Sequence, residues 1–434
     1  MGSKDVSHQV RAQTIASIQP HFLSLSDVPA FYIPFFYLKG NHKVSLDDRL
    51  CGTWITSFLE YAEQVESPDR YKMWVAVSAI SSALGRKCFM SLGDLKTYPN
   101  TYIVLVGPAG IRKSTAIGSV ESMVRELNIV FASDECSRQQ LITEMIGSGV
   151  FDEYSEQNQS TLTVFPDEFT LFLGQRATMI EKIVALTRWF DCPPGFKYTL
   201  RGQTEEIIEN CWITILASTT PSGLEAILSD EISFGGFMSR VMTVYADIVP
   251  KFVHVPRYDT TLSDMLLNDL LIINDMRGEF TVTDSFIKAH IDFRENPPEF
   301  HTHKKALIAE YAMRRDLHLR KLAMIFSASR SNDMVVDLID FEMALDVLQD
   351  YEQALLRMFD AVSGLPYRAC LRAMQLFLDK YFKTNDLITY KRISQEFAME
   401  FPLEDIATCI EVLAKARKIG AKKVDGESVL IPLE

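Results

Sequence analysis

The stretch YIVLVGPAGIRKST, residues 102–115, decides the fold that we expect for this 434-residue chain. Its first five residues are apolar, as in a strand that is buried on both faces of a parallel sheet. A glycine-containing loop follows. Residues from Lys113 to Leu127 then place apolar side chains at helical spacing. The stretch therefore predicts a strand, a loop and a helix within an α/β fold that has a parallel sheet core.

The loop resembles a phosphate-binding loop. Backbone N–H groups between a strand and a helix N-terminus bind anions, and the pattern G-x-x-x-x-G-K-[ST] adds a lysine for the terminal phosphates and a hydroxyl for Mg²⁺. We predict ATP binding by residues 107–115, with Lys113 on the phosphates and Ser114 on Mg²⁺. The nine residues are Gly107, Pro108, Ala109, Gly110, Ile111, Arg112, Lys113, Ser114 and Thr115.

The match departs from the pattern at one position. Arg112 stands where the second glycine is expected, so a side chain enters a tight turn. For the loop taken alone, a chance near-match remains the alternative.

A second apolar run ends in acids. Leu162 to Phe165 are followed by Pro166, Asp167 and Glu168. An acid at the end of a strand beside the phosphate-loop strand can bind Mg²⁺, and a glutamate after it can activate the attacking water. We assign the metal to Asp167, together with Ser114, and the catalytic base to Glu168. Ordinary surface polarity is the alternative.

A third apolar run begins at Cys211 and ends in Ser218, Thr219, Thr220 and Pro221. In oligomeric ATPases with a phosphate-binding loop, a polar residue at such a strand end lies between the acid-bearing and phosphate-binding strands and senses the γ-phosphate. Thr219 or Thr220 is the candidate. A cap at a strand-to-helix junction is the alternative.

One arginine follows a flexible glycine pair. Gly235 and Gly236 precede Arg240, which lies at the edge of the apolar run from Val241 to Tyr245. An arginine delivered from here to a neighbouring subunit's γ-phosphate would neutralise charge during phosphoryl transfer. A surface arginine with a carboxylate partner is the alternative.

Composition restricts the class of protein. Apolar residues make up 47% and charged residues 23%, as in globular proteins, and the net charge of −13 leaves nucleic-acid contact to local basic patches. The seven cysteines form no C-x-x-C pair, which is typical of reduced cytosolic proteins. No apolar run is long enough to span a membrane. We expect a cytoplasmic protein without a membrane partner.

The chain divides into five expected regions: an aromatic-rich N-terminal arm (1–45), a helical N-terminal subdomain (46–86), an ATPase core (87–257), a helical lid (258–362) and a winged helix (366–434). Within the core, Asp152 to Ser160 is expected to be a surface loop. The lid is expected to contain no comparable strand. Its basic residues crowd one long helix and are Arg314, Arg315, His318, Arg320 and Lys321. An arginine among them could reach a bound nucleotide, and a solvated helix face is the alternative for most of the run.

The last region reads as three helices and a hairpin with an Asp425-Gly426 turn, the order of a winged helix. From Tyr367 onward eleven basic residues balance ten acids, so this region lacks the acidity of the rest. DNA contact is expected through Lys415, Arg417, Lys418, Lys422 and Lys423, and a protein-binding module is the alternative.

From Thr53 to Leu356 the chain resembles the uncharacterised P-loop ATPases of phages, prophages and plasmids, which are described as helicase-like and are associated with primases. The shared features are, in order, Phe58-Leu59-Glu60-Tyr61, Trp74 to Gly85, Tyr98-Pro99-Asn100, the loop from Gly107 to Thr115, Pro166-Asp167-Glu168, Ser218-Thr219-Thr220-Pro221, Gly236-Phe237 with Arg240, and His318 with Lys321-Leu322-Ala323. This family tolerates an arginine before the loop lysine.

The resemblance implies an AAA+ or RecA-type ATPase core that forms a homo-oligomeric ring. This ring would couple ATP hydrolysis to movement along DNA during replication of a mobile element. A primase or polymerase would be its partner. A nucleotide-gated loader or scaffold for a replication or defence partner, without unwinding activity, is the main alternative.

Overall fold

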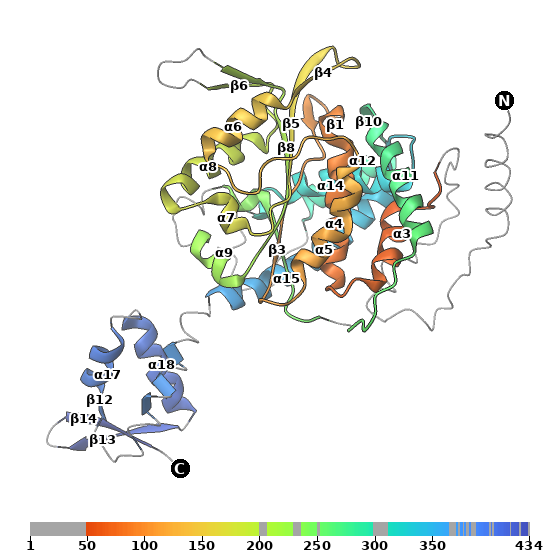
Figure 1. The fold of residues 1–434 in the computed structure, drawn as a ribbon. Helices are drawn as coiled ribbons and strands as arrows, with labels where there is room; N and C mark the ends of the chain where they lie inside the picture. Colours follow the sequence, from red (N-terminus) through yellow and green to blue (C-terminus); the bar gives the residue numbers. More distant parts are fainter. Residues whose placement is uncertain are drawn as a thin grey trace, which may run out of the picture. The chain divides into compact units, whose positions relative to one another are not determined.

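The computed structural model describes residues 49–198, 206–228, 236–249, 252–297 and 311–363, most of 388–432, and some positions between 370 and 382. Helices combine with parallel and antiparallel sheets, which confirms the α/β class (Figure 1). The expected N-terminal arm lies outside the described residues, as do Gly235, Arg417 and the Asp425-Gly426 turn.

The central sheet has five strands in the order β4-β5-β8-β3-β9. Neighbours from β5 to β9 are parallel, and β4 forms an antiparallel pair with β5. The strands are β3 (Tyr102–Val106), β4 (Gly149–Asp152), β5 (Gln157–Val164), β8 (Trp212–Thr219) and β9 (Val241–Tyr245). Since β8 lies between β3 and β5, the carboxyl ends of these three strands meet at one edge of the sheet.

Three buried strands of this sheet match the sequence prediction. Every residue of β3, β8 and β9 is buried, as expected for nearly continuous apolar runs in a parallel sheet. On the far side of β5, Val130 and Ala132 exchange backbone hydrogen bonds with Thr163, both at 2.9 Å. The helices that follow the core strands are α5 (Lys113–Arg125), α6 (Arg138–Gly147), α7 (Phe169–Leu173), α8 (Arg176–Trp189) and α9 (Pro221–Leu228).

The described residues between 258 and 362 are largely helical, as expected, but they also include two short strands. They contribute β10 (Gly278–Val282) and β11 (Val335–Val336) to a second sheet, in which β10 pairs in parallel with β1 (Cys88–Leu92). The sheet is completed by β2 (Leu95–Thr97). Strand β10 escapes notice in the sequence because its alternation extends over only five residues and begins at Gly278.

Helices that precede the expected ATPase core in the sequence pack against helices that follow it. The N-terminal helices are α3 (Trp54–Tyr61) and α4 (Asp69–Leu84), and the later ones are α11 (Thr260–Asp275), α12 (Asp284–Glu295), α14 (Arg315–Arg330) and α15 (Leu338–Ser363). Helix α11 packs against α3 and α4, and α14 packs against α4 and α15. Regions that the sequence analysis separated therefore share one hydrophobic core.

Two hairpins were also missed. Asp152 to Ser160, expected to be a loop, is largely the β4–β5 hairpin, whose polar residues give no apolar alternation. The stretch after Pro194 forms a second hairpin from β6 (Gly195–Tyr198) and β7 (Glu206–Glu209), which extends from the body of the core (Figure 1).

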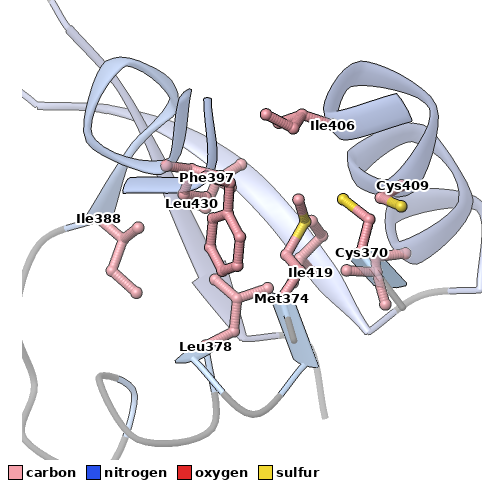
Figure 2. Close-up of a cluster of buried hydrophobic side chains, with 11 residues drawn as sticks. Cys370, Met374, Leu378, Ile388, Phe397, Ile406, Cys409, Ile419 and Leu430 are labelled. Atoms are coloured by element: carbon pink, nitrogen blue, oxygen red, sulfur yellow. The ribbon is translucent and has the colours of Figure 1, made fainter. Parts of the chain in front are cut away.

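The C-terminal part has its own core. Helices α17 (Tyr390–Phe397) and α18 (Leu403–Lys415) pack with a three-stranded sheet of order β12-β14-β13, formed by β12 (Ile388–Thr389), β13 (Ile419–Val424) and β14 (Glu427–Pro432). Figure 2 shows its buried side chains, among them Met374, Phe397, Ile406 and Leu430. Lys415, Lys418, Lys422 and Lys423 are exposed.

A buried ion pair joins α14 to α15. Arg315 Nε lies 2.5 Å from Glu352 Oε1, and the Tyr311 hydroxyl donates to the same oxygen at 2.9 Å. Burial raises the pKa of Glu352, an effect that Arg315 and Tyr311 oppose. Removal of one partner leaves an uncompensated charge in the protein interior, which strongly lowers the free energy of unfolding.

We therefore expect Glu352→Ala to lower the free energy of unfolding by about 3–5 kcal/mol, because the Arg315 guanidinium would lose its carboxylate. Urea denaturation measures this. Gln349→Ala, at an exposed position of the same helix, is the control and should change stability by less than about 0.5 kcal/mol. Equal stabilities of the two variants would contradict the expectation.

Candidate functional site

The loop after β3 begins at Gly107, which is closely surrounded by the backbone of Ala246 and the side chain of Tyr71. A Cβ atom on Gly107 would lie 2.5 Å from both the Ala246 carbonyl oxygen and the Tyr71 hydroxyl. That hydroxyl donates to the Val106 carbonyl at 2.6 Å. Only glycine fits at position 107, so the first glycine of the pattern has a steric reason.

The backbone conformation at Arg112 explains how an arginine can stand where the phosphate-loop pattern has its second glycine. Arg112 adopts φ +66° and ψ +37°, the left-handed region that favours glycine, and costs about 1–2 kcal/mol there. Its guanidinium lies 3.5 Å from Glu66, and the Ser67 hydroxyl donates to its carbonyl at 3.1 Å. The backbone therefore keeps a glycine-like turn, supported by contacts from the segment before α4.

Helix α5 begins at the end of this turn with no side chain capping its N-terminus. Ser114 and Thr115 in its first turn are exposed, as are Pro108, Ala109 and Gly110 in the loop. Uncapped N–H groups and the helix dipole together favour an anion here. The nine residues predicted to bind ATP thus form one continuous loop and helix start.

Lys113 folds back onto this loop. Its Nζ donates to the carbonyl oxygens of Gly107 at 2.8 Å and Pro108 at 3.1 Å. Burial lowers the pKa of Lys113, and the nearby charge of Glu168 opposes that shift. The Glu168 carboxylate after β5 is therefore near enough to Lys113 for the two charges to interact.

Two threonine hydroxyls hold Glu168. Its Oε1 accepts from Thr219 Oγ1 at 2.7 Å and from Thr170 Oγ1 at 2.9 Å. The Thr219 carbonyl in turn accepts from the Gly107 backbone N–H at 3.3 Å. Thr219 consequently connects the phosphate-binding loop to the predicted base, and Oε2 of Glu168 accepts no hydrogen bond from the described residues.

The two threonine candidates differ in role. Thr220 Oγ1 accepts from the Gly223 N–H at 3.1 Å, which is the helix-capping alternative. Thr219 is buried, and its hydroxyl would lie 2.5 Å from a Cβ atom on Gly223. The geometry therefore favours Thr219 over Thr220 as the residue coupled to Glu168.

Asp167 lies beside this network with its side chain exposed. Its backbone carbonyl accepts from Ser218 Oγ at 2.6 Å. Its carboxylate and the Ser114 hydroxyl, both exposed at the same edge of the sheet, are oxygen donors of the kind that Mg²⁺ takes when phosphates supply further ligands. No cluster of three or more His, Cys, Asp or Glu side chains suited to a metal occurs among the described residues, so these two would depend on such phosphates.

Arg240 lies elsewhere. It immediately precedes β9, and the register pairs Val241 with Tyr102, so it stands at the amino edge of the sheet. Its Nη2 donates to Asp191 Oδ2 at 2.9 Å and its Nη1 to the Gly236 carbonyl at 2.6 Å. In this structure Arg240 is a buried arginine with a carboxylate partner.

Three contributing residues were missed in the sequence. Thr170 follows Glu168 by two positions and could have been suggested by the helix-capping pattern. Tyr71 and Asp191 reach their partners from distant positions, and no local signal identifies them.

A cavity of about 920 Å³ lies near the starts of β5 and β8, and none of the predicted site residues line it. Its cations already have partners. Arg86 donates to the carbonyls of Cys192 and Cys211, and Lys87 donates to Asn274. We therefore place the candidate site at the carboxyl edge of the sheet.

The chain matches no family model, and no curated protein matches it. No helix among the described residues is both long and apolar enough to cross a membrane. Function has to be inferred from the geometry at the carboxyl edge.

The conformation of Arg112 predicts how its substitutions behave. Arg112→Gly should keep the free energy of unfolding within about 1 kcal/mol of wild type, because relief of left-handed strain offsets the added freedom of the unfolded chain. Arg112→Val should lose about 1–3 kcal/mol, since a β-branched residue is poorly suited to this conformation. Chemical denaturation of wild type and the two variants measures these differences in the free energy of unfolding. A valine variant as stable as wild type would contradict the conclusion that the backbone at position 112 is strained.

Proposed function

We propose that the protein is an ATP-hydrolysing enzyme with a P-loop core of the AAA+/RecA type. The observation that carries this proposal is the connection from Gly107 through Thr219 to Glu168, with Lys113 donating to the carbonyl of the same Gly107. It joins an anion-binding loop, a lysine and a candidate base at one sheet edge. Such an arrangement suits phosphoryl transfer to water.

Different groups of the chain bind the phosphates and activate the attacking water. Backbone N–H groups of the loop and of the first turn of α5 bind the phosphates, and Lys113 turns from the carbonyls of Gly107 and Pro108 to the terminal phosphates. Glu168 accepts a proton from the attacking water through Oε2 while Thr219 and Thr170 hold Oε1. Water adds to the γ-phosphorus, the bond to the ADP oxygen breaks, and ADP and phosphate leave. Mg²⁺, held by Ser114 and Asp167 when bound, would neutralise phosphate charge.

We extend the proposal to an oligomer that acts on DNA, as the resemblance implies, with residues 258–362 as lid and 366–434 as winged helix. The position of Arg240 supports shared sites, because an arginine at the amino edge can meet a triphosphate only on another copy. The exposed lysines of the C-terminal part support DNA contact. We favour a helicase-like motor for replication of a mobile element, over a loader that does not unwind DNA.

Lys113→Ala should reduce ATP hydrolysis to background, because the terminal phosphates lose their lysine. Glu168→Gln should bind ATP but lose at least about 100-fold in kcat, since the amide cannot accept the proton. Phosphate release and binding of a fluorescent ATP analogue measure both effects. Lys288→Ala, at an exposed position of α12, is the control and should hydrolyse ATP normally. Normal turnover by Lys113→Ala would overturn the proposal.

The double variant Lys422→Glu/Lys423→Glu should weaken DNA binding and reduce the slope of log K against log salt by about two, because two phosphate contacts are lost. Lys96→Glu/Lys288→Glu makes the same charge change at exposed positions outside the C-terminal part and should leave that slope unchanged. Strand displacement on forked DNA then separates a motor, which unwinds, from a loader.

A further inference from the structure

The amino edge of the central sheet carries a group of charges that the ATP site of the same subunit does not use. Asp191, which follows α8, pairs with two arginines. Arg240 Nη2 lies 2.9 Å from Oδ2, and Arg314 Nη1 lies 3.6 Å from Oδ1. Arg314 is the residue before α14, whose N-terminus has no side-chain cap and adds the positive end of a helix dipole.

Positive charge is in excess here. Lys321 lies near enough for its pKa to be raised by Asp191 and lowered by Arg314, although burial is the dominant effect and brings it to about 8. His318 contributes no charge at neutral pH, because burial lowers its pKa to about 4. Lys321 is buried and donates to Tyr98 and Asn100, so the contacts of Asp191 are with Arg240 and Arg314. One carboxylate is thus shared by two arginines, which leaves positive charge that can accept an anion from outside.

The two arginines differ in how freely they can leave Asp191. The Arg240 side chain is 9% exposed and donates to both Asp191 and the Gly236 carbonyl. The Arg314 side chain is 26% exposed, and its contact with Asp191 is longer. Arg314 can turn to a new partner while keeping contact with water, whereas Arg240 would leave a buried contact behind.

Arg240 lies too far from the phosphate loop of its own chain to serve it, and Arg314 contacts the same carboxylate as Arg240. Arg240 lies one residue before the pair Val241 and Tyr102, and Gly107 lies five residues beyond that pair along β3. Six steps of about 3.3 Å place them about 20 Å apart along the strands. An anion that these arginines meet must come from a second molecule.

We propose that Arg314 is the residue that contacts the γ-phosphate of ATP bound to a neighbouring copy of this chain, and that Arg240 and Asp191 position it. This rests on the proposed ATPase function and identifies which arginine of the pair touches the substrate. In a head-to-tail assembly, the carboxyl edge of one copy meets the amino edge of the next. The guanidinium neutralises charge that grows on the γ-phosphate as its bond to ADP breaks.

Arg314→Ala should lower kcat by at least about 100-fold while the affinity for a fluorescent ATP analogue and the melting temperature stay near wild type. Arg240→Ala should lower both kcat and the melting temperature, because it removes a buried contact. Arg314→Lys should recover only part of kcat, since a point charge lacks the planar fork of arginine. Arg294→Ala, an exposed arginine on α12, is the control and should be normal.

Mixing variants tests whether Arg314 acts on another copy. Lys113→Ala offers an intact Arg314 and Arg314→Ala an intact phosphate loop, so equal mixing should restore roughly a quarter of wild-type hydrolysis in randomly assembled oligomers. Full activity of Arg314→Ala, or a mixture no more active than its components, would overturn the inference while the ATPase proposal stands. Full activity of Lys113→Ala would overturn both.

Discussion

The parallel pairing of β8 with both β3 and β5 is the constraint on which the rest of the structure depends. It places the ends of these strands at one edge, so that Thr219 can donate to Glu168 while its carbonyl accepts from Gly107. A one-residue shift of β8 would turn the Thr219 hydroxyl to the other face of the sheet. The register of a buried strand thus sets the geometry of the candidate site.

The loop is supported from outside the sheet. Tyr71 on α4 donates to the Val106 carbonyl, and the segment before α4 contacts Arg112 through Glu66 and Ser67. Helix α4 also packs against α11 and α14, and α11 contacts α5 as well, so the helices of residues 258–362 touch both the helix that supports the loop and the helix that follows it. A movement of these helices on nucleotide binding would therefore be transmitted to the turn at Arg112, and this coupling suits the motor proposed above.

The sequence was most informative where apolar runs are buried on both faces. Strands β3, β8 and β9 and the start of α5 lie where the pattern predicted, because a run such as Tyr102 to Val106 has few alternatives in a folded chain. The hairpin strands and β10 were missed, since polar residues such as Gln157 to Ser160 pair through the backbone and leave no hydrophobic signal. The Asp191 pairings depend on contacts across 49 residues or more, which only the fold brings together.

A structure of the protein with Mg²⁺ and a non-hydrolysable ATP analogue tests the central claim most directly. We predict the β- and γ-phosphates within hydrogen-bond distance of the backbone N–H groups from Gly110 to Ser114, with Lys113 Nζ moved from the Gly107 carbonyl to the γ-phosphate. A nucleotide bound away from this loop, with Lys113 still on the carbonyls of Gly107 and Pro108, would contradict the account.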